Sequence, residues 1–445
     1  MATQQKPLTI LTPIKSDKVD QLREVLKSIV DNDVEENDIV PFGKLTKIHF
    51  ARWVIIDQIH QKPVPPKLLF STNYDAPLEG HLQELVVLAG SGLDQIYSHC
   101  TDYPGPDGLL DYLKSHRVGY GAFHVAVHGH SVVQIHQEAK LRDAIENYID
   151  QNSSNPDWVG PNASARILAD IKEFVRNSPD ELEWALDPPP KPSFFWKLQH
   201  YGKLVFLVIP LALLLAFVLY ILFGGLSISW IWYLATVVAI LLAAFLFLVV
   251  LRAKEKRDPQ TPNTRYSEHD IYLASLEDRI VQNQMTNISP VKPGMFRRTT
   301  LWLVLKGIEI AARYLLTGGT LGGVTTIHFA RWVIFDKGRS LIFLSNYGGS
   351  WEGYLGDFID KASEGLTAIW SNTALYPRTS FLIKQGAKDE QRFKVWAREQ
   401  QIFTDVWYSA YKTLSVSNIM NNSEIRNGLS REMGAEEVRA WLRRL

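Results

Sequence analysis

The chain contains one ten-residue stretch twice, and this duplication limits its possible folds more than any other feature. Ile-His-Phe-Ala-Arg-Trp-Val-Ile-Ile-Asp occupies residues 48–57, and a copy identical at nine of the ten positions occupies residues 327–336. A second shared block runs from Asn-Tyr to Glu-Gly in both copies, at residues 73–80 and 346–353. A shared Tyr-Pro pair lies at the same distance beyond the Glu in each. This order and spacing indicate an internal duplication.

The composition gives little information about binding partners. The 445 residues include 47 Lys and Arg and 47 Asp and Glu, so no overall charge attracts the chain to nucleic acid, and we expect no nucleic-acid partner. The single Cys100 rules out an internal disulfide framework. The chain begins without an apolar segment of the secretory type. Both features favour a reducing, cytoplasmic setting.

The secondary structure expected in the first copy follows from its hydrophobic periodicity. Ser16 or Asp17 is placed to cap the first helix, and the repeated decapeptide is β-branched and aromatic throughout, as in a central strand. The expected elements are a strand at 8–14, a helix after residue 17, the decapeptide strand, a strand at 67–74, a helix at 79–99 and a strand at 122–127.

The second copy repeats this strand and helix order. Its expected elements are a strand at 286–291, a helix at 299–316, the decapeptide strand, a strand at 340–347, a helix at about 352–371 and a strand at 393–397. The order in both copies, βαββαβ, is that of the ferredoxin-like split βαβ unit. One face of such a sheet is bare of helices and needs a partner. We therefore predict an α+β fold in which two ferredoxin-like repeats close sheet to sheet into a pseudo-dimeric α+β barrel.

A duplicated ferredoxin-like unit of this kind resembles the dimeric α+β barrel superfamily, which includes dye-decolourising peroxidases and chlorite-dismutase-like haem proteins. The resemblance covers both halves and rests on topology and duplication. It implies haem as a candidate cofactor and peroxidase-like chemistry as a candidate activity. The Gly-x-x-Asp-Gly haem motif of the dye-decolourising family is absent, since the stretch at residues 105–108, Gly-Pro-Asp-Gly, is one residue too short.

Two uncharged apolar runs separate the copies. Residues 204–223 and 230–251 are each long enough to cross a hydrocarbon core of about 30 Å as a helix. They predict a transmembrane helical hairpin inserted between the repeats. The predicted domains are a first repeat at 1–150, a connector at 151–203, the transmembrane hairpin at 204–251, a charged linker at 252–275 and a second repeat at 276–445.

The charges beside the two runs predict their orientation. Lys191, Lys197 and Lys203 precede the first run, and Arg252, Lys254, Lys256 and Arg257 follow the second. Because positive residues favour the cytoplasmic side, both soluble domains are expected in the cytoplasm, with the lipid bilayer as a partner. Small residues in the runs, among them Ala235, Ala239 and Ala243, allow close helix contact. Assembly into a homo-oligomer through the membrane is therefore a hypothesis.

Alternation of side chains along the decapeptide strand determines which residues share a face. His49, Trp53 and Asp57 share one face and Arg52 the other, so a His or an Arg is directed into a protein interior in each copy. A buried Arg is costly unless it has partners, and the nearby carboxylates in sequence are Asp57, Asp75, Glu79, Asp336 and Glu352.

Two interpretations of these residues remain open. In the functional one, His49, Arg52, His328 and Arg331 are catalytic, and a ligand pocket in each half is lined by Trp53, Asn73, Tyr74 and Glu79 or by Trp332, Asn346, Tyr347 and Glu352. In the structural one, Arg–Glu and His–backbone contacts fix the register of the sheets and the interface between the copies. Duplication within one chain fits both, and buried ion networks often serve architecture.

The only histidine cluster offers a further candidate site. His124, His128 and His130 lie at or just beyond the end of a predicted strand, where they are candidates for chelating a metal ion. Solvent-facing or satisfied histidines explain the same pattern.

The first function hypothesis is a membrane-anchored cytoplasmic barrel that acts as a scaffold or binds a small molecule of unknown identity at the bilayer surface. The alternative is a haem-dependent, peroxidase-like oxidoreductase acting on a lipophilic or membrane-associated substrate. In that case the Arg and His side chains of the decapeptides would steer a peroxide.

Overall fold

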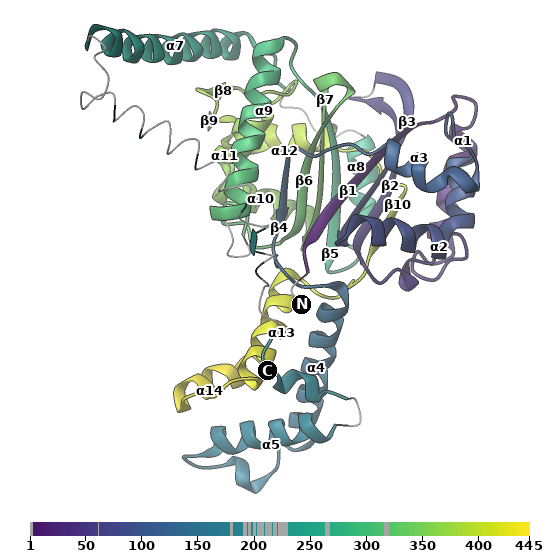
Figure 1. Ribbon diagram of the computed structural model, residues 1–445, viewed down its shortest axis with the longest axis vertical. Coiled ribbons are helices and arrows are strands. Elements are labelled where there is room, and N and C mark those ends of the chain that lie inside the picture. Colours follow the sequence, from purple (N-terminus) through teal and green to yellow (C-terminus); the bar gives the residue numbers. More distant parts are fainter. Residues whose placement is uncertain are drawn as a thin grey trace.

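The computed structural model describes residues 3–60, 62–178, 181–189, 230–262, 268–315 and 320–445, together with a few single positions between 194 and 220. The fold is a mixed α+β structure in which antiparallel sheets lie against one another and helices cover their outer faces (Figure 1). The predicted class, α+β, is thus confirmed.

Each of the two main sheets has four strands. The first has the order β1 (Gln5–Pro13), β3 (Lys62–Asp75), β2 (Ile48–Ile59) and β10 (Val406–Ser409). The second has the order β4 (Ala122–Val125), β6 (Ile327–Phe335), β7 (Ser340–Gly348) and β5 (Gln282–Pro290). The two decapeptides thus lie in β2 and β6. Each is an inner strand of its sheet, next to a short edge strand.

The fourth strands are exchanged between the copies. β4 follows the first copy in sequence but pairs with β6 of the second, with Phe123 opposite Arg331. β10 follows the second copy but pairs with β2 of the first, with Trp407 opposite Arg52. The sequence had placed the strand at 122–127 within the first repeat, and no strand had been predicted at 406–409. Edge pairing with the other copy leaves neither decapeptide strand as a free edge.

The segment that leads into each exchanged strand stays bonded to its own copy. Leu11 N–H donates to the carbonyl oxygen of His116 at 3.1 Å, just before β4. In the second copy, Ile288 N–H donates to the carbonyl oxygen of Gln400 at 2.9 Å, just before β10. Each segment therefore borders one sheet and then the other, which ties the two sheets together along both sides.

The space between the sheets is filled by aliphatic and aromatic side chains. This inner core contains Val54, Ile56, Leu69, Ile288, Val333, Phe335, Ile342 and Leu344. All are buried, and both sheets contribute. Burying such side chains stabilises the fold by about 1.5–3 kcal/mol each relative to exposure, so sheet-on-sheet packing is a major source of stability.

Helices cover the outer faces of the sheets because each has apolar residues along one side. In α1 (Val19–Asp31), Leu22, Leu26 and Ile29 recur at helical spacing and are fully buried. The other covering helices are α2 (Leu78–Tyr97) and α3 (Leu109–Ser115) on the first copy, and α9 (Met295–Ile310), α10 (Trp351–Lys361), α11 (Ser363–Trp370) and α12 (Glu390–Glu399) on the second.

Two predicted elements of the second copy are wrong. Residues 393–397 alternate like a strand but lie in α12, whose start is capped by the Asp389 side chain accepting the Arg392 N–H. The segment forms a helix rather than a strand because helical geometry places Phe393, Trp396 and Ala397 on the buried side. The single helix expected at 352–371 is two helices, interrupted at Ala362, whose ψ of 14° departs from helical geometry.

A separate helical lobe lies below the sheets in Figure 1. It combines α4 (Val132–Gln151) and α5 (Ala163–Asn177), which follow the first copy, with α13 (Val416–Leu429) and α14 (Ala435–Leu442) at the end of the second. Leu141, Ile171, Ile425 and Trp441 pack in its core. Both copies thus contribute to this lobe as well.

One helix extends away from the body. In α7 (Trp230–Arg257) the stretch Leu234–Arg257 is long and apolar enough to cross a membrane, with a mean hydropathy of 3.1. Its apolar side chains are exposed, including Leu241 at 63% and Phe245 at 65%. The other predicted span, 204–223, lies almost wholly outside the described residues, so a two-helix hairpin is not shown. The short strands β8 (Thr379–Ser380) and β9 (Lys384–Gln385) lie near the end of α7. The short helix α8 (Glu268–Leu276) lies near Phe403, which contacts its Tyr272.

Candidate functional site

Arg52, at the centre of β2, points into the space between the sheets and reaches the second copy. Its guanidinium donates five hydrogen bonds to β5 and β7, all to uncharged oxygens. The acceptors are Gln284 Oε1 at 2.9 Å, the Met285 carbonyl at 3.0 Å, Thr286 Oγ1 at 3.0 Å, the Ser345 carbonyl at 2.9 Å and Asn346 Oδ1 at 2.5 Å. The residue is 2% exposed.

Arg331, at the equivalent position of β6, makes the reciprocal contacts with the first copy. Its acceptors are the Leu8 carbonyl at 2.5 Å, Thr9 Oγ1 at 3.1 Å, the Thr72 carbonyl at 2.7 Å and Asn73 Oδ1 at 3.1 Å. Asn346 Nδ2 donates to Asn73 Oδ1 at 3.2 Å and so links the two clusters. The sequence left open whether the His or the Arg of each decapeptide points into the interior, and in the structure both types are buried.

The carboxylates expected to pair with the arginines are engaged elsewhere. Asp57 pairs with Arg23, Asp336 with Arg339, Glu79 with Lys114 and Glu352 with Lys394. Burial, the largest influence, lowers the pKa of Arg52 and of Arg331 to about 9. Guanidinium groups held by neutral oxygens across two sheets clamp those sheets together, which favours the structural interpretation of the arginines.

His49 lies in a chain of three buried polar groups. Its Nε2 is 3.1 Å from Asp75 Oδ1, and its Nδ1 is 3.0 Å from the hydroxyl of Tyr411, which comes from the second copy. Asp75 Oδ2 also accepts the N–H of Val132 at the start of α4. Burial raises the pKa of Tyr411 well above its ordinary value, so the phenol stays protonated. This chain joins the sheets to the helical lobe and uses both nitrogens of the imidazole.

His328, the counterpart of His49, sits among rings rather than in a polar chain. It packs against Phe50 and Tyr411, with ring centroids 5.5 and 5.9 Å away. Burial, with His49 nearby, lowers its pKa to about 3. The four predicted catalytic residues therefore lie between the sheets or at one end of that space, but they do not converge on an open cavity.

The other predicted ligand-binding residues separate into three environments. Asn73 and Asn346 belong to the arginine clusters. Tyr74 stacks on His81 and Tyr347 on Tyr354, with ring centroids 4.2 and 3.8 Å apart, beneath the helices. Glu79 and Glu352 form surface ion pairs, with side chains 54% and 57% exposed. These residues therefore do not line one common pocket in either half.

The predicted histidine cluster does not form a metal centre by geometry. His124 is 1% exposed, neither of its ring nitrogens has a hydrogen-bond partner among the described residues, and burial lowers its pKa to about 3. His128 lies near it, while His130 Nε2 is 3.0 Å from Ser423 Oγ. In the part of the chain that the structure describes, no group of three or more His, Cys, Asp or Glu is arranged to hold a metal ion.

The residues named for a haem site do not fit that cofactor. Both nitrogens of His49 are engaged, Arg52 and Arg331 donate to protein oxygens, and the inner core is filled. His328 Nε2 has no partner among the described residues, but its ring is buried and packed against Phe50 and Tyr411. A haem placed there would break these contacts.

A cavity of about 720 Å³ lies among the helices on the outer side of the second copy. Trp332, Phe358, Leu366 and Ile369 form apolar walls. The polar residues lining it are Asp360, Lys361, Ser363, Glu364 and Lys388. Its size and mostly apolar lining, with a few charged groups, are typical of small-molecule sites.

Two features distinguish this cavity from ordinary packing defects. Ala311, in its wall, belongs to a π-helical turn, Ala311–Leu315, that continues α9, and such turns are frequent at functional sites. Both tryptophans pack against a phenylalanine of the neighbouring strand, Trp53 against Phe70 at 4.5 Å and Trp332 against Phe343 at 4.8 Å between ring centroids. Trp53 also packs against Phe42 at 5.6 Å. The copies have thus diverged around this tryptophan, which lines an open space only in the second.

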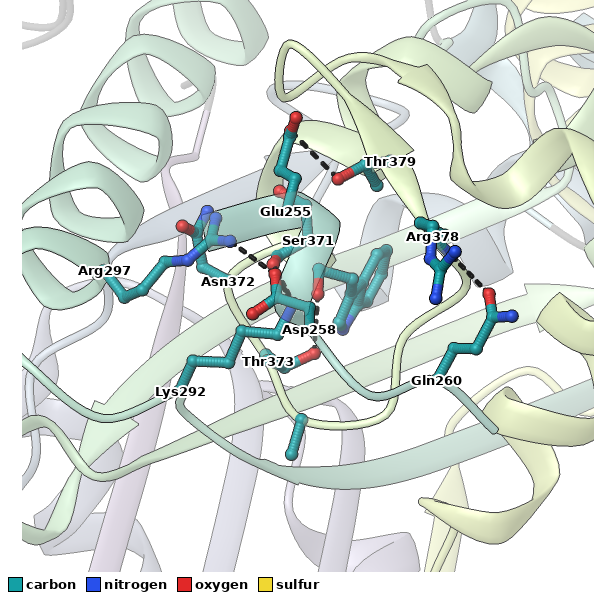
Figure 2. Close-up of polar contacts among 12 residues, drawn as sticks. Glu255, Asp258, Gln260, Lys292, Arg297, Ser371, Asn372, Thr373, Arg378 and Thr379 are labelled. Carbon is teal, nitrogen blue, oxygen red and sulfur yellow. Dashed lines mark hydrogen bonds and ion pairs between the residues drawn. The ribbon is translucent and has the colours of Figure 1, made fainter. Parts of the chain in front are cut away.

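The last turns of α7 are fixed to the second copy by a cluster of buried charges (Figure 2). Glu255 is fully buried and accepts hydrogen bonds from Thr379 Oγ1 and from the N–H groups of Phe381 and Leu382. Asp258 accepts from Lys292 Nζ at 2.8 Å and from Arg297 at 2.5 Å. Burial lowers the pKa of Lys292 to about 8.

Sequence reasoning missed this junction. It used the cations after the second apolar run only as an orientation signal. The overlooked signal is Glu255, a lone acid among Arg252, Lys254, Lys256 and Arg257, which marks a helix side that needs an internal partner. Because Glu255 is bonded to the β8–β9 hairpin, α7 is joined rigidly to the body.

The chain matches no protein-family model, and neither a curated protein nor a solved structure is significantly similar to it.

Proposed function

We propose that the protein is an integral membrane protein whose two ferredoxin-like repeats form one pseudo-dimeric α+β barrel, and that it binds a small apolar or amphipathic molecule at the bilayer surface. The observation that carries the proposal is α7, an exposed apolar helix of membrane-spanning length that is bonded rigidly to a body containing an apolar cavity.

The packing of the copies supports a second crossing. α7 lies between the copies in sequence, yet their sheets pack together and exchange strands, so both copies are on one side of any membrane that α7 crosses. A chain that leaves and returns to the same side crosses an even number of times. Residues 204–223, uncharged and mostly apolar, supply the other span of this proposed hairpin.

The exposed cations at the end of α7 favour a cytoplasmic body. Lys254, Lys256 and Arg257 follow the apolar stretch on the side where the body lies. Positive residues close to a span favour the cytoplasmic side. Homo-oligomer formation through the spans remains a hypothesis that rests on their small residues.

The cavity next to Trp332 suggests the chemical class of the ligand. Its apolar walls suit a hydrocarbon portion, and Lys361 and Lys388 in its lining suit an acidic end group. Lys361 is itself paired with Asp357 at 2.6 Å, so Lys388 is the better candidate for an anionic group. A fatty-acid-like molecule combines both properties.

The anchoring is tested by extraction of native membranes with carbonate at high pH. The full chain is expected to stay in the membrane fraction, and a Leu241→Asp, Leu242→Asp variant is expected to lose that resistance because charges in a span are costly. Val87→Asp, at an exposed apolar position on α2, is the matched control and should behave as the unsubstituted protein. Release of the unsubstituted protein by carbonate would overturn the proposed anchoring.

The ligand site is tested with dansyl-undecanoic acid and the full chain in nanodiscs, against empty nanodiscs. Ala311→Phe places a ring in the cavity and should abolish saturable binding, while Ala169→Phe, at an exposed position of α5, should leave it intact. Saturable binding that survives Ala311→Phe, or no saturable binding by the unsubstituted protein, would contradict this site and this ligand class.

A further inference from the structure

Two aromatic side chains of the body contact α7 near its end. The ring of Phe247, inside the membrane-spanning stretch, lies 5.1 Å from the ring of Phe296 on α9. The Arg252 guanidinium lies 5.7 Å from the ring of Phe381 in the β8–β9 hairpin. Figure 1 shows α9 and this hairpin beside the end of α7. The body therefore reaches the depth of the apolar stretch itself.

The outer face of α9 carries large apolar side chains that are exposed. Met295, Trp302 and Leu303 are 80%, 52% and 55% exposed. Their spacing of seven and eight residues puts them on one side of the helix. Leu301 and Leu305, on the side that faces the body, are buried against the second copy. Large apolar side chains thus lie on the exposed as well as the buried part of α9, and only the buried ones are covered by protein among the described residues.

The β8–β9 hairpin presents a second apolar surface. Phe381 and Ile383, at its tip, are 46% and 41% exposed. The backbone of the tip is fixed, because the N–H groups of Phe381 and Leu382 both donate to Glu255. Because these hydrogen bonds hold the backbone, the Phe381 and Ile383 side chains stay on the surface.

Cations accompany these side chains. Lys254, Lys256 and Arg257 are exposed at the end of α7, Arg298 and Lys306 on α9, and Lys384 in the hairpin. Helices that lie in the interface of anionic membranes combine large apolar side chains such as Trp, Phe and Leu with Lys and Arg, and the exposed part of α9 contains the same residue types. Basic residues near such a membrane surface are attracted to its negative charge.

We propose that Met295, Phe296, Trp302, Leu303, Phe381 and Ile383 form a collar that is immersed in the headgroup region of an anionic bilayer. The proposal rests on the membrane anchoring by α7 proposed above. A bilayer is the occupant because Phe247 belongs to the span and contacts the collar directly, so any lipid around α7 also meets α9. The collar would hold α9 along the membrane surface and bring the second copy, with its cavity, against the lipid.

Nitroxide labels on the full chain in phosphatidylcholine vesicles containing phosphatidylserine test this arrangement. The chosen variants are Leu303→Cys and Phe381→Cys in the collar, Leu241→Cys in the span and Val87→Cys on the far side of the body. The single native Cys100 is buried, and the unsubstituted protein gives its labelling background. Power saturation compares collisions with lipid-soluble oxygen and with a water-soluble nickel chelate.

The labels at residues 303 and 381 are expected to collide more with oxygen than with nickel, as at residue 241, whereas the label at residue 87 should show the opposite. If residue 241 reports lipid but residues 303 and 381 report water, the collar is wrong and the anchoring stands. If residue 241 also reports water, both are wrong. Shielding of residues 303 and 381 from both reagents would identify a protein contact and overturn the collar.

The charge requirement has its own comparison. Arg298→Glu should reduce the oxygen preference at residue 303 in vesicles that contain phosphatidylserine and change little in pure phosphatidylcholine. Lys27→Glu, an equal charge change on exposed α1, should have no effect in either. Equal effects of the two substitutions would overturn the assignment of an anionic surface.

Discussion

Arg52 and Arg331 occupy equivalent positions in the two decapeptides, and each donates its hydrogen bonds to the sheet of the other copy. Every acceptor is an uncharged oxygen, so the positive charges have no ionic partner in these bonds. Both residues are therefore used as donors of fixed geometry. This reciprocal clamp explains why both copies retain an arginine in an apolar space.

We predict that Arg52→Lys destabilises the protein although it keeps the charge. A lysine cannot supply the planar fork, so several buried oxygens lose their donor at about 1–3 kcal/mol each, giving a total loss of about 2–4 kcal/mol in the free energy of unfolding. Chemical denaturation of the detergent-solubilised chain measures this loss. Arg23→Lys, in a partly exposed ion pair with Asp57, should change it by less than about 0.5 kcal/mol. Equal effects at the two positions would refute the clamp.

His124 predicts a loss of stability in mild acid. Its folded pKa is about 3, below the ordinary 6.5, so between these values the unfolded chain binds a proton that the folded chain excludes. Stability is therefore full above about pH 6.5 and falls as the pH drops toward 3, by about 2 kcal/mol between pH 7 and pH 5 for this residue.

His124→Leu should reduce that acid sensitivity by about 2 kcal/mol, measured as the difference in unfolding free energy between pH 7 and pH 5. His99→Leu, at a partly exposed position, is the control and should leave most of the sensitivity in place. An unchanged pH dependence in His124→Leu would show that the buried imidazole is not excluded from protonation.

Glu255→Gln tests the junction between α7 and the body. The amide nitrogen cannot accept the hydrogen bonds that a carboxylate oxygen takes from Thr379, Phe381 and Leu382. The backbone of residues 379–385 should exchange its amide hydrogens at least tenfold faster, since losing a charged acceptor costs about 1.5–3 kcal/mol. Hydrogen exchange with mass spectrometry measures this rate. Glu432→Gln, on the surface, should not change it.

A further prediction concerns haem. The protein purified from haem-replete cells should show no Soret absorbance in proportion to protein, because His49, Arg52 and Arg331 are already bonded to protein groups. Pyridine haemochrome analysis gives the stoichiometry. One haem per chain would contradict the fit argument and restore the peroxidase alternative.

Local patterns predicted much of this fold. The β-branched and aromatic decapeptides identified two central strands, and alternation placed either a His or an Arg of each copy in the interior, because a strand has only two faces. The choice of partners was beyond such patterns. Nothing local in residues 122–125 or 406–409 distinguishes pairing with their own copy from pairing with the other, since the two decapeptide edges are almost identical.

The candidate site was less predictable for a similar reason. Asp75, Glu79 and Glu352 are near the arginines in sequence but bond to other residues, while the actual acceptors are carbonyls and amides from distant strands. The cavity next to Trp332 depends on what surrounds that ring, and the decapeptide alone does not distinguish Trp332 from the enclosed Trp53. A duplicated motif predicts a shared scaffold better than a shared site.

The exchange of β10 has a consequence for biosynthesis. β2 is completed early in translation, but its neighbour at residues 406–409 leaves the ribosome only after α7 and almost all of the second copy. Until then the nascent first sheet has an open edge rich in aromatic and β-branched residues, a hazard for aggregation. Targeting of the apolar segment to a membrane during synthesis would keep neighbouring chains apart during that interval.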